Sequence, residues 1–335
     1  MPRKVKWGIL GAASIAQRRV LPAMRDCQHA EVVAVASRSL DKARSMASQF
    51  AIPKAYGAYE DLLGDPEVEA IYNPLPNHLH VAWSVRAARG GKHVLCEKPL
   101  SRTVAEVRPL LEARDEYNVK IGEAFMVRNH PQWQEARKRA QSGALGEVRA
   151  IQVFFSYHLV DPANVRNQPD IGEGGLLDIG CYPVVVARDI FGAEPLRAIA
   201  LIDHDPNFKI DRMTTGIVDF GQGRRLDFTV STQSVDHQRV DIVGSKGRLE
   251  VPIPFNAPQG KATRLYLDKG QKLGGAAAKS ISLRPADQYR LQGEAFSRAV
   301  RGIEPLAYGI EDSIRQMRVL DALFRSAETG KWETI

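Results

Sequence analysis

The chain has 335 residues, more than one hydrophobic core usually serves, so two domains are expected. Its apolar fraction of 44% and charged fraction of 25% are typical of a water-soluble protein, and its apolar runs are too short to span a membrane. The net charge of +7 comes from 46 basic and 39 acidic residues scattered along the sequence. This scatter argues against a nucleic-acid partner, whereas a small phosphate-bearing ligand would need only a few of the charges.

The N-terminus enters an apolar run almost at once, with no charged-then-apolar leader, so no secretory signal is expected. The three cysteines, Cys27, Cys96 and Cys181, have neither the number of a disulfide framework nor a paired metal-ligand spacing. We therefore expect free thiols in a cytoplasmic protein and no metal site.

A strand is predicted over Val5–Leu10, followed by a tight turn and a helix to about Met24. The turn reads Gly11-Ala12-Ala13-Ser14-Ile15-Ala16, the order of a dinucleotide-binding fingerprint with alanine at its second and third glycines. The helix N-terminus would offer N–H groups and a positive dipole end to a pyrophosphate. A purely structural turn also favours small residues, so this motif alone is weak. The expected cofactor contacts are Gly11, Ala12, Ala13, Ser14 and Ile15.

The second predicted strand, Glu31–Ala36, ends in Ser37 and Arg38, and the helix after it carries Lys42. An NAD site places an acidic side chain at this strand end, to bind the ribose 2′-hydroxyl. A hydroxyl and a guanidinium suit a 2′-phosphate instead, so NADP is predicted rather than NAD. The alternative is an exposed arginine at a helix start.

Further strand–helix repeats predict a doubly wound parallel sheet, hence an α/β Rossmann domain over residues 1–125. The expected elements are a helix at Ala58–Leu63, a strand at Ala70–Tyr72, a helix ending at Gly90, a strand at Val94–Leu95, a helix at Val104–Tyr117 and a strand at Lys120–Phe125. The loop after the strand at Ala70–Tyr72 adds expected cofactor contacts at Leu75, Pro76, Asn77 and His80. A helix cap is the alternative for Asn77, and a structural role the alternative for His80.

The strand Val94–Leu95 ends abruptly in Glu97-Lys98-Pro99. Ligands bind at the carboxyl ends of the strands in open α/β sheets, and a lysine buried there can take part in proton chemistry. By themselves these three residues favour the alternative, a surface lysine before a turn proline.

Residues 126–335 are predicted to form an α+β domain with a large, mostly antiparallel sheet, one face of which would bind a partner subunit in a homodimer or homotetramer. The expected strands are Val148–Phe155, Leu196–Ile202, Met213–Phe220, Arg225–Val230, Arg239–Val243, Arg248–Val251 and Thr263–Leu267. A helix is expected over Gly175–Ile190, a flexible loop near 270–280, and closing helices at 287–303 and 309–329 that could pack back on the first domain.

The helix over Gly175–Ile190 carries Asp178 and Tyr182, which are four residues apart and therefore share a helix face. Tyr182 could exchange a proton with a substrate, and Asp178 could orient a substrate hydroxyl. The glycines nearby would allow close approach by a ligand or another backbone. A half-buried tyrosine and a capping aspartate are the structural alternative.

Four segments together resemble the Gfo/Idh/MocA oxidoreductase family, in order and over the whole chain: 11–16, 76–80, 97–99 and 174–182. The chain looks closest to the branch of NADP-dependent D-xylose 1-dehydrogenase, dimeric dihydrodiol dehydrogenase and glucose–fructose oxidoreductase. That branch has tyrosine at the position of Tyr182, where inositol dehydrogenase-like members have histidine.

The resemblance implies that Lys98 lies beside the nicotinamide and substrate, with a Lys98–Pro99 peptide that is commonly cis. Asp178 and Tyr182 match the other active-site positions, with Tyr182 as the acid/base whose phenolate Lys98 favours. Further expected contacts are Glu97 and Arg128 to the cofactor, and Phe125, Asn164, Arg166 and Asp178 to the substrate.

The predicted activity is oxidation of an aldose at C1 to the lactone with hydride transfer to NADP⁺. Alternatives on the same site are reduction of a dicarbonyl or 1,5-anhydro sugar, and oxidation of a trans-dihydrodiol. An alternative of another class is a non-catalytic NADP-binding regulator.

Overall fold

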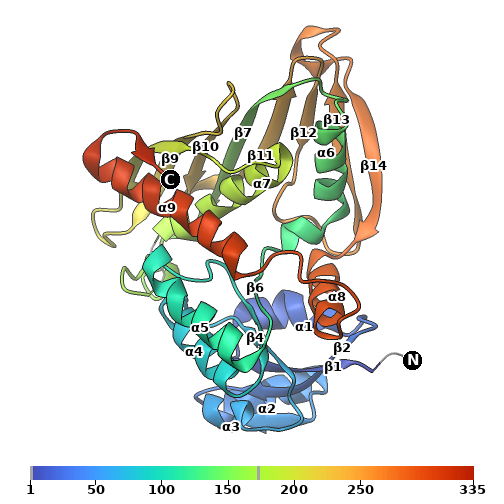
Figure 1. The fold of residues 1–335 in the computed structure, drawn as a ribbon, viewed down its shortest axis with the longest axis vertical. Coiled ribbons are helices and arrows are strands. Elements are labelled where there is room, and N and C mark those ends of the chain that lie inside the picture. Colours follow the sequence, from blue (N-terminus) through green and yellow to red (C-terminus); the bar gives the residue numbers. More distant parts are fainter. Residues whose placement is uncertain (1–2, 172–173) are drawn as a thin grey trace. The chain divides into compact units, whose positions relative to one another are not determined.

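The computed structural model describes residues 3–171 and 174–335, which form two compact units. The first unit consists of Met1–Met126 and Gln288–Ile314, and the second of Val127–Asp287 and Arg315–Ile335 (Figure 1). Residues 288–314 thus belong to the first unit although they follow the second sheet in sequence. None of the helices in the described part of the chain is long and apolar enough to cross a membrane.

The first unit is a Rossmann-type parallel sheet of six strands in the order β3-β2-β1-β4-β5-β6, as the strand–helix repeats predict. Its strands are β1 (Val5–Leu10), β2 (Ala30–Ala36), β3 (Lys54–Tyr56), β4 (Ala70–Asn73), β5 (His93–Cys96) and β6 (Ile121–Glu123). The strand β3 is not predicted from the sequence, because its three half-buried residues give no apolar run to recognise.

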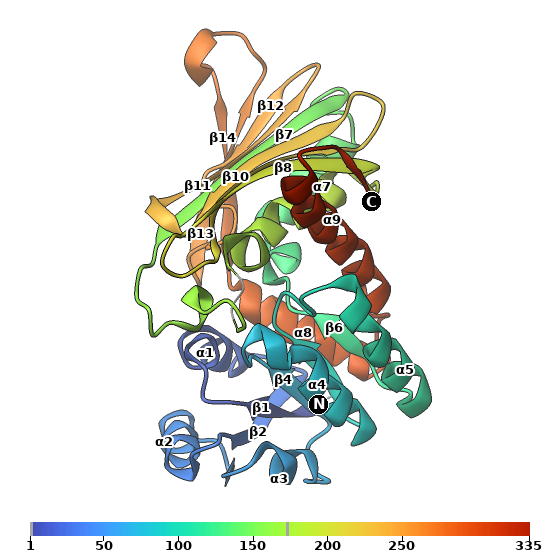
Figure 2. The same cartoon turned by 90° about the vertical axis from the view of Figure 1, so that its left-hand side faces the viewer.

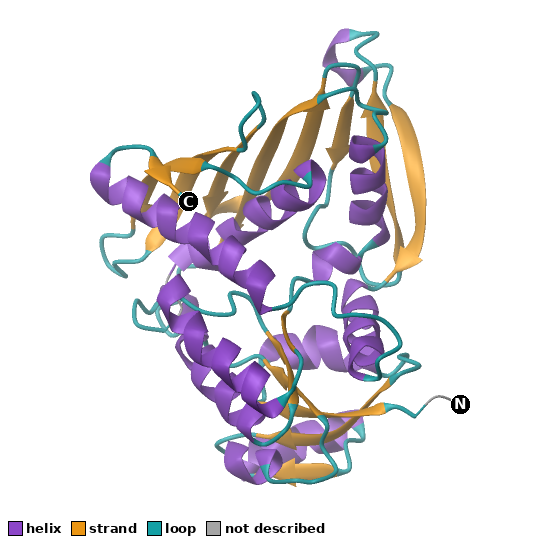
Figure 3. Cartoon of the chain, in the orientation of Figure 1, coloured by secondary structure: helices purple, strands orange, loops and turns teal. Residues whose placement is uncertain are grey.

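Helices cover this sheet on both faces (Figure 3). They are η1, a π-helical turn (Ala16–Val20), with α1 (Leu21–Met24), α2 (Leu40–Phe50), α3 (Tyr59–Leu63), α4 (Asn77–Arg89), η2 (Val104–Val107), α5 (Arg108–Tyr117) and α8 (Gln288–Val300), followed by the start of α9 (Ile310–Thr329). Each Val, Leu or Ile side chain that is fully buried between sheet and helices contributes about 1.5–3 kcal/mol to stability.

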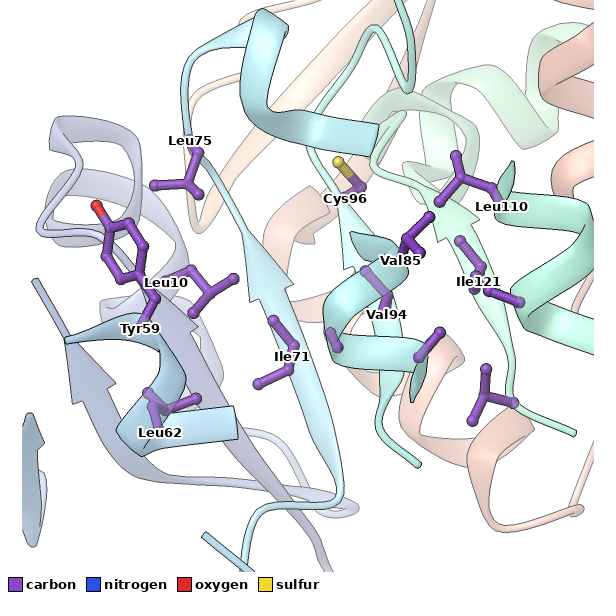
Figure 4. Packing of buried hydrophobic residues seen from close by; sticks show 14 of the residues in the cluster. Leu10, Tyr59, Leu62, Ile71, Leu75, Val85, Val94, Cys96, Leu110 and Ile121 are labelled. Atoms are coloured by element: carbon purple, nitrogen blue, oxygen red, sulfur yellow. The ribbon is translucent and has the colours of Figure 1, made fainter. Parts of the chain in front are cut away.

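The core on one face contains strand residues Leu10, Ile71, Val94 and Ile121 packed against helix residues such as Leu110 (Figure 4). On the other face, the buried Trp7 of β1 packs against Phe296 of α8 at a ring-centroid distance of 5.4 Å. Its indole nitrogen donates to the Ser297 hydroxyl at 3.0 Å. The helix α8 is therefore an integral part of the first unit.

The second unit is a nine-stranded sheet in the order β14-β13-β12-β11-β7-β10-β9-β8-β15. Only β7 and β10 pair in parallel within this described sheet, so the predicted antiparallel character is confirmed. The strands are β7 (Val148–His158), β8 (Arg197–His204), β9 (Asp211–Asp219), β10 (Arg225–Ser231), β11 (Gln233–Gly244), β12 (Arg248–Val251), β13 (Lys261–Asp268), β14 (Lys279–Ala286) and β15 (Glu333–Thr334).

The helices α6 (Pro131–Gln141) and α7 (Cys181–Phe191), with η5 (Leu176–Gly180), pack on one face of this sheet (Figures 1 and 2). The short helices η3 (Met126–Asn129), η4 (Val165–Asn167) and η6 (Leu273–Gly275) lie in connections. Alternate residues of β7, Ile151, Val153 and Phe155, are buried, whereas Gln152 and Phe154 are exposed. This period of two leaves the other face of the sheet open within the unit.

The loop expected near 270–280 is shorter than predicted, because β14 begins at Lys279. This strand is absent from the sequence-based prediction, although Ser280-Ile281-Ser282-Leu283 alternates polar and apolar residues. The strand β11 is longer than predicted, since its first half is polar and exposed on both faces.

Candidate active site

The predicted pyrophosphate turn lies at the carboxyl end of β1. The Gly11 N–H donates to the Ala36 carbonyl at 2.7 Å, and Gly11 has a φ of +83°. A Cβ at this position would lie 3.0 Å from Cδ2 of Leu75 in a conformation that side chains rarely adopt. Ala12 and Ala13 are half-buried and Ser14 is exposed, so this turn leaves backbone accessible to a ligand. These features fit a dinucleotide phosphate.

At the end of β2, Arg38 is exposed and Ser37 is buried. The Ser37 hydroxyl accepts from the Ser39 N–H at 3.4 Å, and the Ser39 hydroxyl caps α2 by accepting from the Lys42 N–H. Burial raises the pKa of Tyr59, and the charge of Arg38 beside it acts in the opposite direction. This strand end therefore offers a guanidinium near an aromatic hydroxyl, which fits a phosphate better than a neutral ribose.

His80 in the first turn of α4 is buried, and its ring bridges two loops of the first unit. Nδ1 lies 2.7 Å from the Pro99 carbonyl and Nε2 lies 2.6 Å from the Leu75 carbonyl. Burial lowers the pKa of His80 to about 4, so the imidazole is neutral at pH 7 and donates one hydrogen to one carbonyl at a time. The geometry gives His80 a clear role in holding these loops, while its contact with a cofactor stays a prediction.

The segment after β5 is fixed by neighbouring strands. The Glu97 N–H donates to the Asn73 carbonyl at 3.0 Å, and the Tyr72 hydroxyl donates to Oε1 of Glu97 at 2.5 Å. The Lys98–Pro99 peptide is cis, as the family resemblance implies. Lys98 is half-buried, and its charge helps to lower the pKa of His80.

In the second unit, Asp178 and Tyr182 lie on one continuous helical segment, and both are buried. Asp178 belongs to the π-helical turn η5, and Tyr182 is the second residue of α7. Such π-helical turns inside helices occur frequently at functional sites. The predicted helix is thus confirmed, with a local widening that spacing alone does not reveal.

The strand β7 lies beneath this helical segment and supplies a partner to each of the two residues. The Tyr157 hydroxyl donates to Oδ2 of Asp178 at 2.6 Å. Two residues earlier, the Phe155 ring meets the Tyr182 ring edge-on at 6.0 Å between centroids. Phe255 packs against Tyr182 as well, at 5.1 Å. The phenol of Tyr182 is therefore held in an aromatic environment.

A second donor reaches Asp178 from η4. Nε of Arg166 lies 3.1 Å from the same Oδ2 atom. The charge of Asp178, with smaller contributions from Tyr157 and Tyr182, raises the pKa of Arg166. Burial first, and then the charge of Asp178, raises the pKa of Tyr157 far above the usual range, so Tyr157 stays a hydroxyl donor.

The start of this helical segment is held by Asp211, the first residue of β9. Oδ2 of Asp211 accepts from the Leu176 N–H and, at 3.3 Å, from the Thr214 hydroxyl. Burial raises the pKa of Asp211 to about 7, although these hydrogen bonds oppose the shift. The sequence predicts that the glycines before the helix allow close approach by a ligand or another backbone, and the backbone and side chain of Asp211 both lie against Gly174.

Two models of known protein families match the chain, one within each unit. The family model described as "Oxidoreductase family, NAD-binding Rossmann fold" matches residues 5–125, and the "GFO/IDH/MocA C-terminal domain" matches residues 133–250. The chain belongs to the Gfo/Idh/MocA oxidoreductase family. It is therefore an NAD(P)-dependent dehydrogenase or reductase with a nicotinamide cofactor.

Other members of the family resemble the chain over nearly its full length. It is 48% identical to an uncharacterized oxidoreductase, ORF334, of Rhizobium meliloti, over 99% of both chains. It is 37% identical to the D-xylose 1-dehydrogenase (NADP(+)) 2 of Haloferax volcanii, over 97% of this chain and 98% of the relative. The crystal structure of KijD10, a 3-ketoreductase of Actinomadura kijaniata with NADP and TDP-benzene, matches with a TM-score of 0.90 and 30% identity over 97% of this chain and 98% of that one.

Several residues that the sequence assigned to this Gfo/Idh/MocA site are engaged in structural contacts. Arg128 is buried and forms an ion pair with Asp189 of α7, at 3.2 Å from Nε to Oδ2. The Asn164 side chain caps η4 by accepting from the Arg166 N–H.

In the first unit, Asn77 is the first residue of α4, whose N-cap is Pro76, so it does not cap that helix itself. Phe125 is buried at the end of the first unit. Their contacts with cofactor and substrate stay predictions.

Two residues of the site, Tyr157 and Asp211, are not predicted from the sequence. Tyr157 follows Ile151, Val153 and Phe155 at intervals of two residues. The face of β7 on which it lies could therefore have been predicted from the alternation of side chains along a strand. Asp211 opens a strand and has no motif around it that could have revealed its role.

Proposed function

We propose that this enzyme oxidises an aldose at C1 to the lactone with NADP⁺, in carbohydrate metabolism. The observation that carries the proposal is the arrangement of Asp178 and Tyr182 on one buried helical segment, with a hydrogen-bonded carboxylate next to a phenol in aromatic surroundings. The full-length likeness to a D-xylose 1-dehydrogenase supports an aldose as the substrate.

In this proposal Tyr182 removes the proton of the C1 hydroxyl, and Asp178 accepts a hydrogen bond from a neighbouring sugar hydroxyl. A bound NADP⁺ would supply the two-electron acceptor for the hydride of C1, while the hydroxyl proton passes to Tyr182. Lys98 supplies a positive charge to the reaction. General acid–base assistance of this kind contributes about 10²–10⁴-fold in rate.

The cofactor is proposed to be NADP, bound through Ser37, Arg38 and Lys42 at its 2′-phosphate. The support is the exposed guanidinium at the end of β2, where an NAD site would have a carboxylate. The relative from Haloferax volcanii is named as an NADP(+) enzyme, and KijD10 was crystallised with NADP.

A second candidate is reduction of a keto group on a nucleotide-linked sugar, which the likeness to the KijD10 3-ketoreductase favours. The same catalytic groups would serve, with Tyr182 giving rather than taking a proton. A panel of aldoses, nucleotide-linked keto sugars, dicarbonyls, dihydrodiols and 1,5-anhydro sugars, followed at 340 nm with NADP(H) and NAD(H), separates these candidates. Turnover of none of them would favour a non-catalytic NADP-binding regulator.

We propose that the open face of the second sheet joins copies of the chain into a homodimer or homotetramer. Large apolar side chains are exposed on its strands: Phe154, Leu201, Met213, Ile217 and Val235. Leu201 is 77% exposed, which is unusual for a leucine in the middle of a strand. Light scattering of the wild type and of L201E tests this: a monomeric wild type would contradict the proposal.

We also propose a cytoplasmic location, because Cys27, Cys96 and Cys181 are all buried thiols. Fractionation of the source cells tests it, and recovery with secreted protein would contradict it.

A further inference from the structure

We infer that Tyr157 is a positioning residue: its hydroxyl fixes one oxygen of Asp178, so that the ionised carboxylate is held ready for a substrate hydroxyl. The inference rests on the proposed function, because it takes from there the role of Asp178 in binding the sugar. It assigns to a residue outside the family motifs a specific part in substrate binding.

The first support is the convergence of two donors on one atom. The Tyr157 hydroxyl lies 2.6 Å and Nε of Arg166 lies 3.1 Å from Oδ2 of Asp178. The donors come from β7 and η4, and the acceptor from η5, so three separate elements determine where the carboxylate lies. A carboxylate held from two directions loses little conformational entropy when a substrate binds.

The second support is the protonation of Tyr157. Burial and the charge of Asp178 raise the pKa of Tyr157, so its hydroxyl keeps its proton and can only donate to the carboxylate. Tyr157 and Tyr182 thus have different tasks. Tyr157 holds Asp178, and Tyr182 is left as the residue that exchanges a proton with the substrate.

The third support is the register between strand and helix. Tyr157 and Phe155 are two residues apart on β7 and contact Asp178 and Tyr182, which are four residues apart on the helical segment. Two strand residues span about 6.6 Å, so the two contacts lie about one helical turn apart. One strand face therefore aligns both members of the catalytic pair.

The same geometry adds to the role of Arg166. The predicted contact of Arg166 with sugar hydroxyls stays a prediction, and its Nε is in addition engaged with Asp178. Arg166 acts on the substrate through Asp178, and it shares this positioning task with Tyr157.

The test compares Y157F with wild type on the best aldose and on its deoxy analogue lacking the hydroxyl that Asp178 accepts. Loss of a hydrogen bond to a charged group should raise KM for the aldose about tenfold, with kcat within about threefold and NADPH affinity unchanged. On the deoxy analogue Y157F should equal wild type. Added to D178N, Y157F should have no further effect. A matched control is Y56F, because the Tyr56 hydroxyl donates to Oδ2 of Asp65 at 2.9 Å beside Lys54, the same chemistry outside the site.

A Y157F enzyme with wild-type KM while D178N is impaired would overturn the inference and leave the proposed function standing. Wild-type activity of both D178N and Y182F would instead overturn the proposed function. If Y157F does not fold, a crystal structure of the wild type with NADPH and sugar decides. The inference expects Tyr157 still bonded to Asp178 and the sugar hydroxyl on Asp178; a Tyr157 hydroxyl bonded to the sugar contradicts it.

Discussion

The carboxylate of Asp211 occupies the space that a side chain at Gly174 would need. A Cβ on Gly174 would lie 1.7 Å from Oδ1 of Asp211, and the φ of Gly174 is +81°. Oδ2 of the same carboxylate accepts the Leu176 N–H. The first residue of β9 thus fixes where the helical segment with Asp178 and Tyr182 begins.

Replacing Gly174 by alanine should therefore cost stability beyond backbone strain. A matched control is G143A, because Gly143 has a φ of +77° but no atom within 4 Å of the place that its Cβ would take. We expect G143A to cost about 1 kcal/mol in the free energy of unfolding, and G174A clearly more, with a lower kcat. Equal unfolding midpoints of the two variants in denaturant would contradict this, because they would show that the Asp211 side chain can move aside without destabilising the fold.

The raised pKa of Asp211 predicts a distinct pH dependence of stability. Its folded-state pKa of about 7 exceeds the ordinary value of 3.8, so its stabilising contribution is full below the ordinary value and is lost as pH rises through 7. D211N should not show this loss. The melting temperature of D211N relative to wild type should therefore rise between pH 5 and pH 8. D205N is the contrast, because hydrogen bonds lower the pKa of Asp205 and its contribution is lost on acidification instead. A difference in melting temperature between D211N and wild type that does not vary with pH would contradict the burial argument.

Arg38 should determine the choice of cofactor. We expect R38S to lower kcat/KM for NADP⁺ by about 10–100-fold, the value of a charge-assisted hydrogen bond, with little change for NAD⁺. The control is R44A, because Arg44 is an exposed arginine of α2 that lies more than one helical turn beyond the end of β2. Steady-state rates with both cofactors measure this. An equal loss for NADP⁺ and NAD⁺ would argue for a structural role through Tyr59.

His80 should make the wild type sensitive to acid. Its folded-state pKa is about 4 and its ordinary value is 6.5. The stabilising contribution of the neutral imidazole is therefore present above pH 6.5 and is lost as pH falls through 4. H80Q should lose less stability than wild type between pH 6.5 and pH 4.5 in thermal melts. H237Q, at an exposed histidine of β11, should keep the wild-type slope. A slope for H80Q as steep as that of wild type would mean that His80 is already charged when folded.

The sequence was most informative where local pattern and chemistry coincide. The strands β1, before Gly11, and β5, before Lys98, are short apolar runs with abrupt ends. Both the strands and the place of their carboxyl ends could therefore be predicted. The strand β3 is too short for a pattern, and β14 was hidden by the glycines before it. The Tyr157–Asp178 contact joins residues 21 positions apart and depends on strand–helix register, which no local pattern encodes. The π-helical turn at Asp178 likewise depends on packing rather than propensity.

The central claim, that Tyr182 is the acid/base of an aldose-oxidising enzyme, is tested most directly by turnover of Y182F. NADPH formation is followed at 340 nm with the best aldose, beside Y266F as a tyrosine control on β13. We predict that kcat of Y182F falls by about 10²–10⁴-fold, while its melting temperature and NADPH affinity stay near those of the wild type and Y266F remains active. Near-normal turnover by a folded Y182F would contradict the claim.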